Sequence, residues 1–333
     1  MNDVNYPRKI NIGAQYPSGF HRSGWWDVLQ SLAVVHHDNG VNVDAFVDLS
    51  FAYNRPPYGT LPYRSPWIGF IHCPQNMPRW FQYETAPQTV FKKRAWIESL
   101  PQCRGIFCLS EYHRQWLAGQ LPVPEENLIY PTEIPERRFS MERFNANRDK
   151  KVVQIGWWLR RLNAIFQLPT KTIRKAMLHL NQTFVDKYLE EERKLLKQGL
   201  RLSSDQSNLP IDLDSAEIIR YLSNEAYDEL LSENIAFMHL YDTSANTAII
   251  ECIARATPLL VNPLTAVREY LGADYPFYFN TLEEAARKAE DTALIAQAHE
   301  YLKNAPIRER LTHDYFLRSF AESTIYRSLP EAR

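Results

Sequence analysis

Residues suited to phosphate binding gather in the segment 234–262. Its pattern predicts, in order, a buried strand, a polar loop, a helix and a second buried strand, over 235–240, 241–246, 247–255 and 258–261. Asn246 and Thr247 stand at the start of the predicted helix, where side chains and backbone N–H groups can hold a phosphate. Because α/β folds bind phosphates at loops that follow parallel strands, the segment predicts an anion-binding site.

Two acids belong to the same segment. Glu251 falls in the early turns of the predicted helix, where its carboxylate can face a ligand, although an acid there also favours the helix itself. Asp242 opens the polar loop, and it fits either an ordinary turn or a role in chemistry. We expect Glu251 to bind a ligand, and both interpretations of Asp242 stay open.

A histidine and two arginines follow other predicted strands. His72 comes directly after the strand predicted over 67–71, and it either caps that strand or serves as an acid, a base or a hydrogen-bond donor. Arg160 and Arg161 lie shortly after the strand predicted over 152–155. Because a guanidinium group matches the geometry and charge of a diphosphate, we expect at least one of the two to bind phosphate rather than form an exposed basic pair.

Weaker signals come from other positions. The loop 16–24 contains Gly19, and glycine allows a backbone to approach a ligand closely. His239 lies within an apolar strand and is expected to be a core residue. Asp212 and Asp214 have a spacing that can hold a divalent cation, but they follow no clear strand and are interpreted as solvated. No zinc-binding, Walker or serine-hydrolase motif occurs, so no metal site is predicted.

Strands and helices alternate along the chain, which predicts parallel sheets and an α/β fold. Further strands are expected over 9–14, 41–49, 105–109 and near 277–279, and further helices over 25–37, 110–117, 224–231, 266–271 and from 282 onward. The charged segment 170–200 is predicted to be a solvated helical excursion, whereas 216–221 fits a strand or a helix.

The polar stretch 136–151 is the best candidate for a linker. Two successive α/β units joined by it predict two facing Rossmann-like domains with a cleft between them. We expect the first domain over 1–147, the second over 148–306, and a helix over 307–333 that returns to the first. Ligands in such sheets bind beyond the carboxyl ends of the strands, where the candidate residues lie.

Composition and charge argue against a nucleic-acid-binding, secreted or membrane-spanning protein. The chain has 333 residues and a net charge of −1, so no global field favours nucleic acid or an anionic membrane. Its four cysteines form no Cys-x-x-Cys pair, which indicates a reducing compartment. Neither an apolar leader nor a run of about 18 apolar residues occurs. We therefore expect a cytoplasmic protein without a transmembrane segment.

Five segments follow one another in an order known from one enzyme family. They are 106–113 (IFCLSEYH), 128–135 (LIYPTEIP), 152–156 (VVQIG), 221–231 (YLSNEAYDELL) and the run 235–261. Together they resemble the retaining glycosyltransferases of the GT-B fold, particularly family 4, over most of the chain. The resemblance implies a nucleotide-diphosphate sugar as donor, no further cofactor, and transfer with retention to a glycan or small-molecule acceptor.

The resemblance also assigns roles to the acids and to His72. Glu251 matches the second of the family's two donor-site glutamates, which implies a bond to the donor ribose. Thr243 occupies the position of the first glutamate, and the adjacent Asp242 is the candidate to replace it. His72 resembles the histidine that the family places near the transferred sugar.

The basic residues are implied to hold the diphosphate. The family's usual arginine and lysine after the glycine are displaced here, because Trp157 follows Gly156. Arg160 or Arg161, with N–H groups near Asn246 and Thr247, would then stabilise the charge of the departing diphosphate.

Two other functions stay open. The missing first glutamate also fits a non-catalytic nucleotide-sugar-binding or regulatory protein on the same fold. A basic cluster over 91–94 leaves open a modified nucleic-acid base as acceptor, although the nearly neutral net charge argues against nucleic acid.

Overall fold

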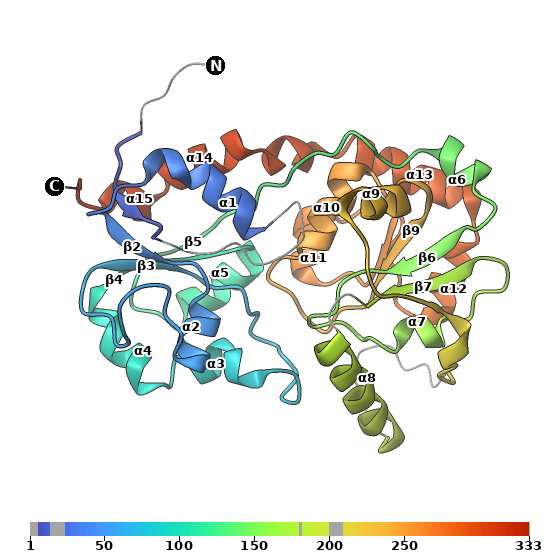
Figure 1. Cartoon of the computed structure of the whole chain (residues 1–333), viewed down its shortest axis with the longest axis horizontal. Coiled ribbons are helices and arrows are strands. Elements are labelled where there is room, and N and C mark those ends of the chain that lie inside the picture. The colour runs from blue at the N-terminus through green and yellow to red at the C-terminus, as the bar shows by residue number, and fades with distance from the viewer. Residues whose placement is uncertain (1–5, 14–23, 180–181, 200–208, 333) are drawn as a thin grey trace. The chain divides into compact units, whose positions relative to one another are not determined.

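The computed structural model describes residues 6–13, 24–179, 182–199 and 209–332 (Figure 1). The chain divides into two compact units: unit 1 comprises 1–133 and 309–333, and unit 2 comprises 134–308. The predicted boundary at 147/148 lies within unit 2. Each unit contains a five-stranded sheet whose strand pairs are all parallel. The predicted α/β fold class is therefore confirmed.

Unit 1 is built on a sheet with strand order β1-β2-β3-β4-β5, so neighbours in the sheet are also neighbours along the chain. Its strands are β1 (Ile10–Asn11), β2 (Val41–Asp44), β3 (Trp67–Phe70), β4 (Cys103–Cys108) and β5 (Glu125–Asn127). Its α-helices are α1 (Trp25–Leu32), α2 (Val47–Tyr53), α3 (Pro87–Val90), α4 (Arg94–Ser99), α5 (Glu111–Ala118), α14 (His313–Glu322) and α15 (Thr324–Ser328).

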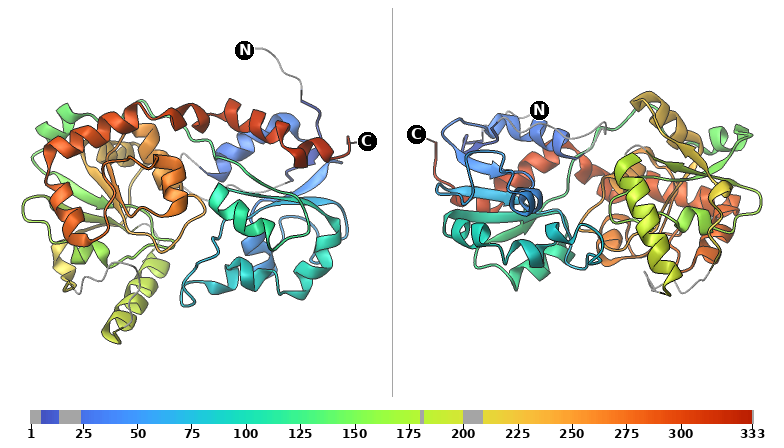
Figure 2. Two further views of the ribbon diagram at one scale, coloured as in Figure 1. Left: turned by 180° about the vertical axis from the view of Figure 1, so that it is seen from behind. Right: turned by 60° about the horizontal axis from the view of Figure 1, so that its bottom comes forward.

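Helices cover both faces of this sheet (Figures 1 and 2). One face is filled by apolar side chains from α2 to α5 and the strands, among them Val47, Phe51, Trp67, Val90, Trp96, Ile106 and Leu117. On the other face, α15 approaches β4 so closely that a Cβ atom on Gly105 would lie 2.6 Å from Ile325. Phe320 of α14 packs there as well, on the ring of Phe107. The C-terminal helices are thus part of the core of unit 1.

The sequence prediction of a strand over 41–49 is wrong beyond Asp44. β2 ends at this residue, and α2 begins at Val47. The Asp44 carboxylate accepts a hydrogen bond from the backbone N–H of Phe46 at 3.0 Å, which turns the chain at the strand end. Ser50 and Tyr63 donate to the same carboxylate at 2.9 and 2.7 Å, so it ties β2 to α2 and to the next loop.

This buried carboxyl should make the stability of unit 1 depend on pH. Burial raises the pKa of Asp44 from 3.8 to about 6, although its hydrogen bonds act in the opposite direction. The ionised form is less favourable in the folded chain than in the unfolded one, so stability is lost as pH rises through the folded pKa. Compared with the Asp44→Asn variant, the free energy of unfolding of the wild type should fall by about 2 kcal/mol from pH 4 to pH 7. Denaturant titrations of both proteins across this range measure the difference, and a difference independent of pH would contradict the assignment.

Unit 2 has the strand order β10-β9-β6-β7-β8. The strands are β6 (Lys151–Gln154), β7 (Arg174–Leu178), β8 (Glu217–Ile219), β9 (Ile235–Met238) and β10 (Leu259–Val261). Its α-helices are α6 (Met141–Ala146), α7 (Ala164–Gln167), α8 (Gln182–Lys197), α9 (Asn224–Glu233), α10 (Thr247–Arg255), α11 (Thr265–Leu271), α12 (Leu282–Ala289) and α13 (Thr292–Lys303). The chain builds outward from β6 to β8 on one side, then returns to place β9 on the other side of β6.

The order in which the chain adds strands to the sheet therefore reverses between β6 and β9, although the two strands are parallel. Loops at such a switch point separate to opposite faces and leave a crevice at the carboxyl ends of the two strands, which is where open α/β sheets bind ligands. The loops in question follow β6 and β9, and they carry Arg160, Arg161, Asp242 and Asn246. The topology thus brings together residues that are about eighty positions apart in the sequence.

Several predictions for unit 2 can be compared with these elements. The helix over 247–255 is confirmed as α10, and the ambiguous segment 216–221 contains the strand β8. The segment 170–200 is not only helical, because β7 precedes α8. The polar stretch 136–151 contains α6, and the expected strand near 277–279 forms only a single bridge between Val261 and Tyr278.

All four cysteines are buried and form no disulfide. Among the helices of the described residues, none has both the length and the hydropathy that a membrane span requires.

Candidate functional site

The loops after β6 and β9 pair directly with each other at the switch point. The backbone N–H of Arg161 donates to the carbonyl of His239 at 2.7 Å, and the N–H of Tyr241 donates to the carbonyl of Leu159 at 2.9 Å. Arg160 and Leu240 form an antiparallel bridge between these two bonds. The loop that carries the arginines is thereby fixed against the loop that carries Asp242.

Arg160 lies at the centre of this arrangement and is 6% exposed. Its guanidinium donates to the carbonyls of Ile155 and Trp158, at 3.0 and 2.6 Å, and to the side-chain oxygen of Asn246 at 2.9 Å. It packs flat on Gly156, whose φ is +71° and whose position a Cβ atom could not share, since that atom would lie 2.5 Å from the guanidinium. Gly156 is therefore needed both for its backbone conformation and for the space that Arg160 takes.

The charge of Arg160 has no ion-pair partner among the described residues. Burial lowers the pKa of its guanidinium to about 10, while Tyr227 and Glu251 act in the opposite direction. The group thus stays protonated at neutral pH. A buried cation whose hydrogen-bond partners are all neutral, here three oxygens and the sulfur of Met238, attracts an anion strongly, because little water screens it.

Asn246 connects this cation to the start of α10. It is the N-cap residue of the helix, and its side-chain oxygen accepts from the backbone N–H of Ala248 at 3.1 Å as well as from Arg160. Thr247 is the first helical residue and is half-buried, so part of it is open to solvent. The partial positive charge of the helix start and the guanidinium thus lie side by side, as an anion site requires.

Arg161 has different partners. It is 2% exposed, donates to the side-chain oxygen of Gln167 at 2.9 Å, and lies 3.6 Å from the carboxylate of Glu192. Its charge is therefore already paired within unit 2. Of the two arginines that the sequence singled out, Arg160 has the environment suited to an external anion.

Glu251 is buried on α10, with an exposed fraction of 2%. Its carboxylate accepts a hydrogen bond from the hydroxyl of Tyr227 at 2.7 Å. One turn further along α10, Arg255 is bonded to Asp228 at 2.6 Å and stacks on the ring of Tyr227. Burial, and then the charge of Glu251, raise the pKa of Tyr227, so this tyrosine remains a hydrogen-bond donor.

The remaining members of this loop are also buried. Asp242 is 4% exposed, and one carboxylate oxygen accepts from the N–H of Thr243 at 2.9 Å. The hydroxyl of Thr243 donates to the carbonyl of Ala245 at 2.7 Å. His239 is a core residue, as predicted, at 1% exposure, and its Nδ1 has no hydrogen-bond partner among the residues that the structure describes. Burial, with the charge of Arg161, holds the pKa of His239 well below its usual range, so the ring is neutral.

Unit 1 places His72 at the carboxyl end of β3, within a group of polar residues. Its Nε2 is 2.7 Å from the hydroxyl of Tyr130, and its Nδ1 is 3.5 Å from the carboxylate of Asp48. Asp48 is buried and also accepts from the backbone N–H groups of His72 and Cys73, at 2.8 and 3.2 Å. The imidazole stacks on Phe46 with ring centroids 4.7 Å apart. His72 is one-fifth exposed, so a fixed and oriented imidazole remains accessible.

His113 lies near the same acid but has a different character. Burial lowers its pKa to about 4, while the charge of Asp48 acts in the opposite direction. The ring is fully buried on α5 and is therefore neutral at physiological pH. It is therefore not accessible to a substrate.

The predicted residues thus fall into two groups, one in each unit. Unit 2 brings together Arg160, Arg161, Asp242, Asn246, Thr247 and Glu251, and unit 1 holds His72. Gly19 lies outside the described residues. Asp212 and Asp214 lie together at the 3-10 helix 213–215, where the Asp212 carboxylate accepts from the N–H of Asp214. Within the described ranges, no group of acids, histidines and cysteines is arranged to hold a metal ion.

The sequence did not single out four residues that complete these groups, namely Asp48, Tyr130, Glu192 and Tyr227. A signal for Glu192 was present: it falls on the buried stripe of α8, in register with Val185, Tyr188 and Leu189. The others have no such signal, because their partners come from distant parts of the chain.

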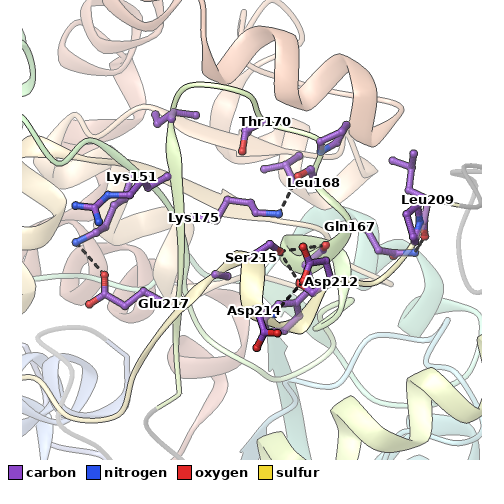
Figure 3. A pocket seen from close by; sticks show the side chains of 16 residues that line it. Lys151, Gln167, Leu168, Thr170, Lys175, Leu209, Asp212, Asp214, Ser215 and Glu217 are labelled. Atoms are coloured by element: carbon purple, nitrogen blue, oxygen red, sulfur yellow. Dashed lines mark hydrogen bonds and ion pairs between the residues drawn. The ribbon is translucent and has the colours of Figure 1, made fainter.

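A cavity of about 630 Å³ lies at the opposite edge of the unit 2 sheet (Figure 3). It borders the first residues of β6, β7 and β8, whereas parallel sheets bind ligands at their carboxyl ends. Its walls hold both signs of charge: Lys151 is paired with Glu217 at 3.0 Å, and Lys175, which donates to the carbonyl of Leu168, lies opposite Asp212. Such mixed walls select no particular class of ligand.

Neither the models of protein families nor the curated proteins provide a match to this chain. Solved structures do resemble it. Sucrose-phosphate synthase from Thermosynechococcus elongatus has a TM-score of 0.58 at 12% identity, with 86% of this chain and 73% of that chain covered. Anabaena HepE, in complex with UDP-glucose, has a TM-score of 0.55 at 12% identity, with 78% and 72% covered.

TarM of S. aureus, in a complex that contains UDP, has a TM-score of 0.53 at 12% identity. The match covers 78% of this chain and 51% of TarM, so this chain spans about half of the TarM length. At such low identity these likenesses concern the fold, which is the GT-B fold with its two Rossmann-like parts.

Proposed function

We propose that this protein is a glycosyltransferase whose donor is a nucleoside diphosphate sugar. The observation that carries the proposal is the buried guanidinium of Arg160, which has no carboxylate partner among the described residues and is bonded to the N-cap residue of α10. This is the arrangement that a diphosphate requires, since a fixed cation and a helix start meet its charge together. The site also lies at the sheet's switch point, where open α/β sheets bind ligands. A nucleotide is supported by TarM and HepE, which share the fold and are seen in complexes with UDP or UDP-glucose.

The proposal gives each group in unit 2 a role. Arg160 and the start of α10 hold the diphosphate, and they stabilise the charge that develops on it when the glycosidic bond breaks. Glu251 accepts hydrogen bonds from the donor ribose. Asp242 contacts the transferred sugar in place of the glutamate that Thr243 replaces. We propose uridine as the base, because TarM and HepE are seen with UDP or UDP-glucose.

Unit 1 would supply the acceptor side and His72. In the proposal, the acceptor is a glycan or a small molecule. His72 lies beside the transferred sugar near the bond that breaks, with its orientation set by Asp48 and Tyr130. Transfer proceeds with retention of the anomeric configuration, and we propose that the protein acts in the cytoplasm.

A non-catalytic nucleotide-sugar-binding protein is the second candidate. It is favoured by Thr243, whose hydroxyl is engaged with the carbonyl of Ala245 and which offers no carboxylate to a sugar. Such a protein would bind the donor through the same diphosphate site. The two candidates therefore differ in turnover rather than in binding.

One experiment tests the function directly. The purified protein is screened by thermal unfolding against UDP, GDP and ADP and their sugars, since a specific ligand raises the unfolding temperature by mass action. The donor that binds is then incubated with the protein, with and without candidate acceptors, and nucleoside diphosphate release is measured. Binding with release supports the enzyme, and binding without release under any acceptor supports the second candidate. No shift with any nucleotide would reject both.

Glu251→Gln should weaken binding of UDP by roughly tenfold, because the ribose loses a charged hydrogen-bond acceptor. The ribose contact can be isolated by comparing UDP with 2′-deoxy-UDP. Wild-type protein should bind the deoxy analogue more weakly than UDP. The variant should bind both alike, because the contact is already lost with the carboxylate and removing the ribose hydroxyl then costs nothing more.

Tyr227→Phe serves as the matched control for this variant. It removes the hydroxyl that donates to Glu251 but keeps the carboxylate, so discrimination against the deoxy analogue should persist. Calorimetric titration of the three proteins with the two ligands measures all six affinities. Equal discrimination by wild type and Glu251→Gln would show that the ribose contact lies elsewhere.

A further inference from the structure

The carboxylate of Glu192 connects α8 to both loops of the candidate donor site. α8 projects from the rest of unit 2, but Glu192 itself is fully buried (Figures 1 and 2). One of its oxygens accepts from the backbone N–H and the side-chain amide of Asn163, at 2.8 and 2.7 Å. The other accepts from the hydroxyl of Tyr241 at 2.7 Å and lies 3.6 Å from the guanidinium of Arg161.

These partners belong to the two loops at the switch point. Arg161 and Asn163 follow β6, and Tyr241 follows β9. Each is a close neighbour along the chain of a residue assigned to the donor, since Arg160 precedes Arg161 and Asp242 follows Tyr241. A shift of either loop would therefore move a group that is proposed to touch the donor.

The energetics of this carboxylate favour a positioning role. A buried ionised acid is costly unless its oxygens are fully bonded, and here Asn163 and Tyr241 donate three hydrogen bonds in addition to the charge of Arg161. Such a network is satisfied in one geometry only, so it fixes the relative positions of its members. An apolar side chain would serve packing alone at least as well.

An aromatic stack extends the contact of α8 to the residue after Gly156. The rings of Phe184 and Tyr188 on α8 lie parallel to the ring of Trp157, with centroids 5.3 and 6.0 Å away. The helix therefore contacts the loop after β6 at Trp157 as well as at Asn163. α8 thus braces the whole segment from Trp157 to Asn163.

We propose that Glu192 is a positioning residue that locks the loops after β6 and β9 together, so that Arg160 and Asp242 are held ready for a nucleoside diphosphate. The role of the loops in donor binding rests on the proposed function. The locking itself does not, and it can be measured without any ligand.

The test compares Glu192→Gln with Glu190→Gln, an exposed acid on the same helix. Amide hydrogen exchange is followed at residues 160–163 and 240–246. We expect exchange there to quicken roughly tenfold or more in Glu192→Gln, as the loss of charged hydrogen bonds predicts, and to remain at the wild-type rate in Glu190→Gln. Exchange within β7, which is distant from the network along the chain, should not change in either variant.

Calorimetry then measures the dissociation constant for UDP, which should rise roughly tenfold in Glu192→Gln and not in the control. If Glu192→Gln fails to fold, Tyr241→Phe removes a single hydrogen bond to the same carboxylate and should show the same pattern to a smaller extent. Unchanged exchange in a folded variant overturns the proposal, as does an unchanged affinity where the wild type binds UDP. Wild-type protein that binds no nucleotide would defeat the proposed function, and hydrogen exchange would still decide whether Glu192 locks the loops.

Discussion

Arg160→Met should weaken the binding of UDP by roughly a hundredfold, because it removes the buried cation that is proposed to hold the diphosphate. Methionine fills much of the same space, so the cavity left behind is small. The side-chain oxygen of Asn246 loses one of its two donors but keeps the N–H of Ala248, so α10 retains its cap. Isothermal titration at neutral pH measures the affinity, and the unfolding temperature shows whether the variant is intact.

Two further variants separate charge from geometry. Arg160→Lys keeps the charge but not the planar fork that reaches Ile155, Trp158 and Asn246, so an intermediate affinity is expected. Arg174→Met is the matched control, since it removes an exposed arginine from the opposite edge of the same sheet. If Arg160→Met bound UDP as tightly as Arg174→Met, the diphosphate site would not be at Arg160.

The elements that could be predicted from the sequence are those whose signals are local. The helix over 247–255 was predicted with its correct limits, because Asn246 is a strong N-cap residue and an apolar face follows it. Ser223 likewise marks the start of α9, where its hydroxyl accepts from the N–H of Ala226. In both cases the residues that form the helix also define its start.

The strand β7 was missed for a reason that concerns its position in the sheet. It begins with Arg174 and Lys175, and only its last three residues are fully buried. A short run of this kind next to the long charged helix α8 resembles a continuation of that helix. Pairing with β6 and β8 decides its conformation, and pairing partners cannot be read from a local pattern.

In the candidate site, too, some features could be predicted from the sequence and others depend on distant partners. The residues after each strand could be predicted, because the carboxyl ends of parallel strands are where ligands bind. Their environments could not: Arg160 and Arg161 are adjacent and identical in type, yet one is bonded to neutral oxygens and the other is paired with Glu192. That difference arises from α8, an element that the sequence suggested was solvated.

In unit 1, the loss of the His72 imidazole should lower kcat by roughly 10²- to 10³-fold, which is the usual contribution of a positioned proton donor or acceptor. Affinity for UDP should change little, because the proposed diphosphate and ribose contacts belong to unit 2. His72→Gln is the variant of choice, since its amide can still bond to Tyr130. Initial rates at several donor concentrations separate kcat from KM. His36→Gln provides a matched control, because His36 is also paired with an acid, Asp38, in unit 1.

The orientation of His72 gives this prediction a second test. The Asp48 carboxylate accepts from the backbone N–H groups of His72 and Cys73 and faces Nδ1 of the ring. When the hydroxyl of Tyr130 donates to Nε2, the proton of the neutral ring is therefore on Nδ1. Tyr130→Phe frees Nε2 and keeps the ring stacked on Phe46, so it should lower kcat by roughly tenfold, less than loss of the ring itself. A smaller effect of His72→Gln than of Tyr130→Phe would mean that the tyrosine hydroxyl, rather than the imidazole, contacts the sugar.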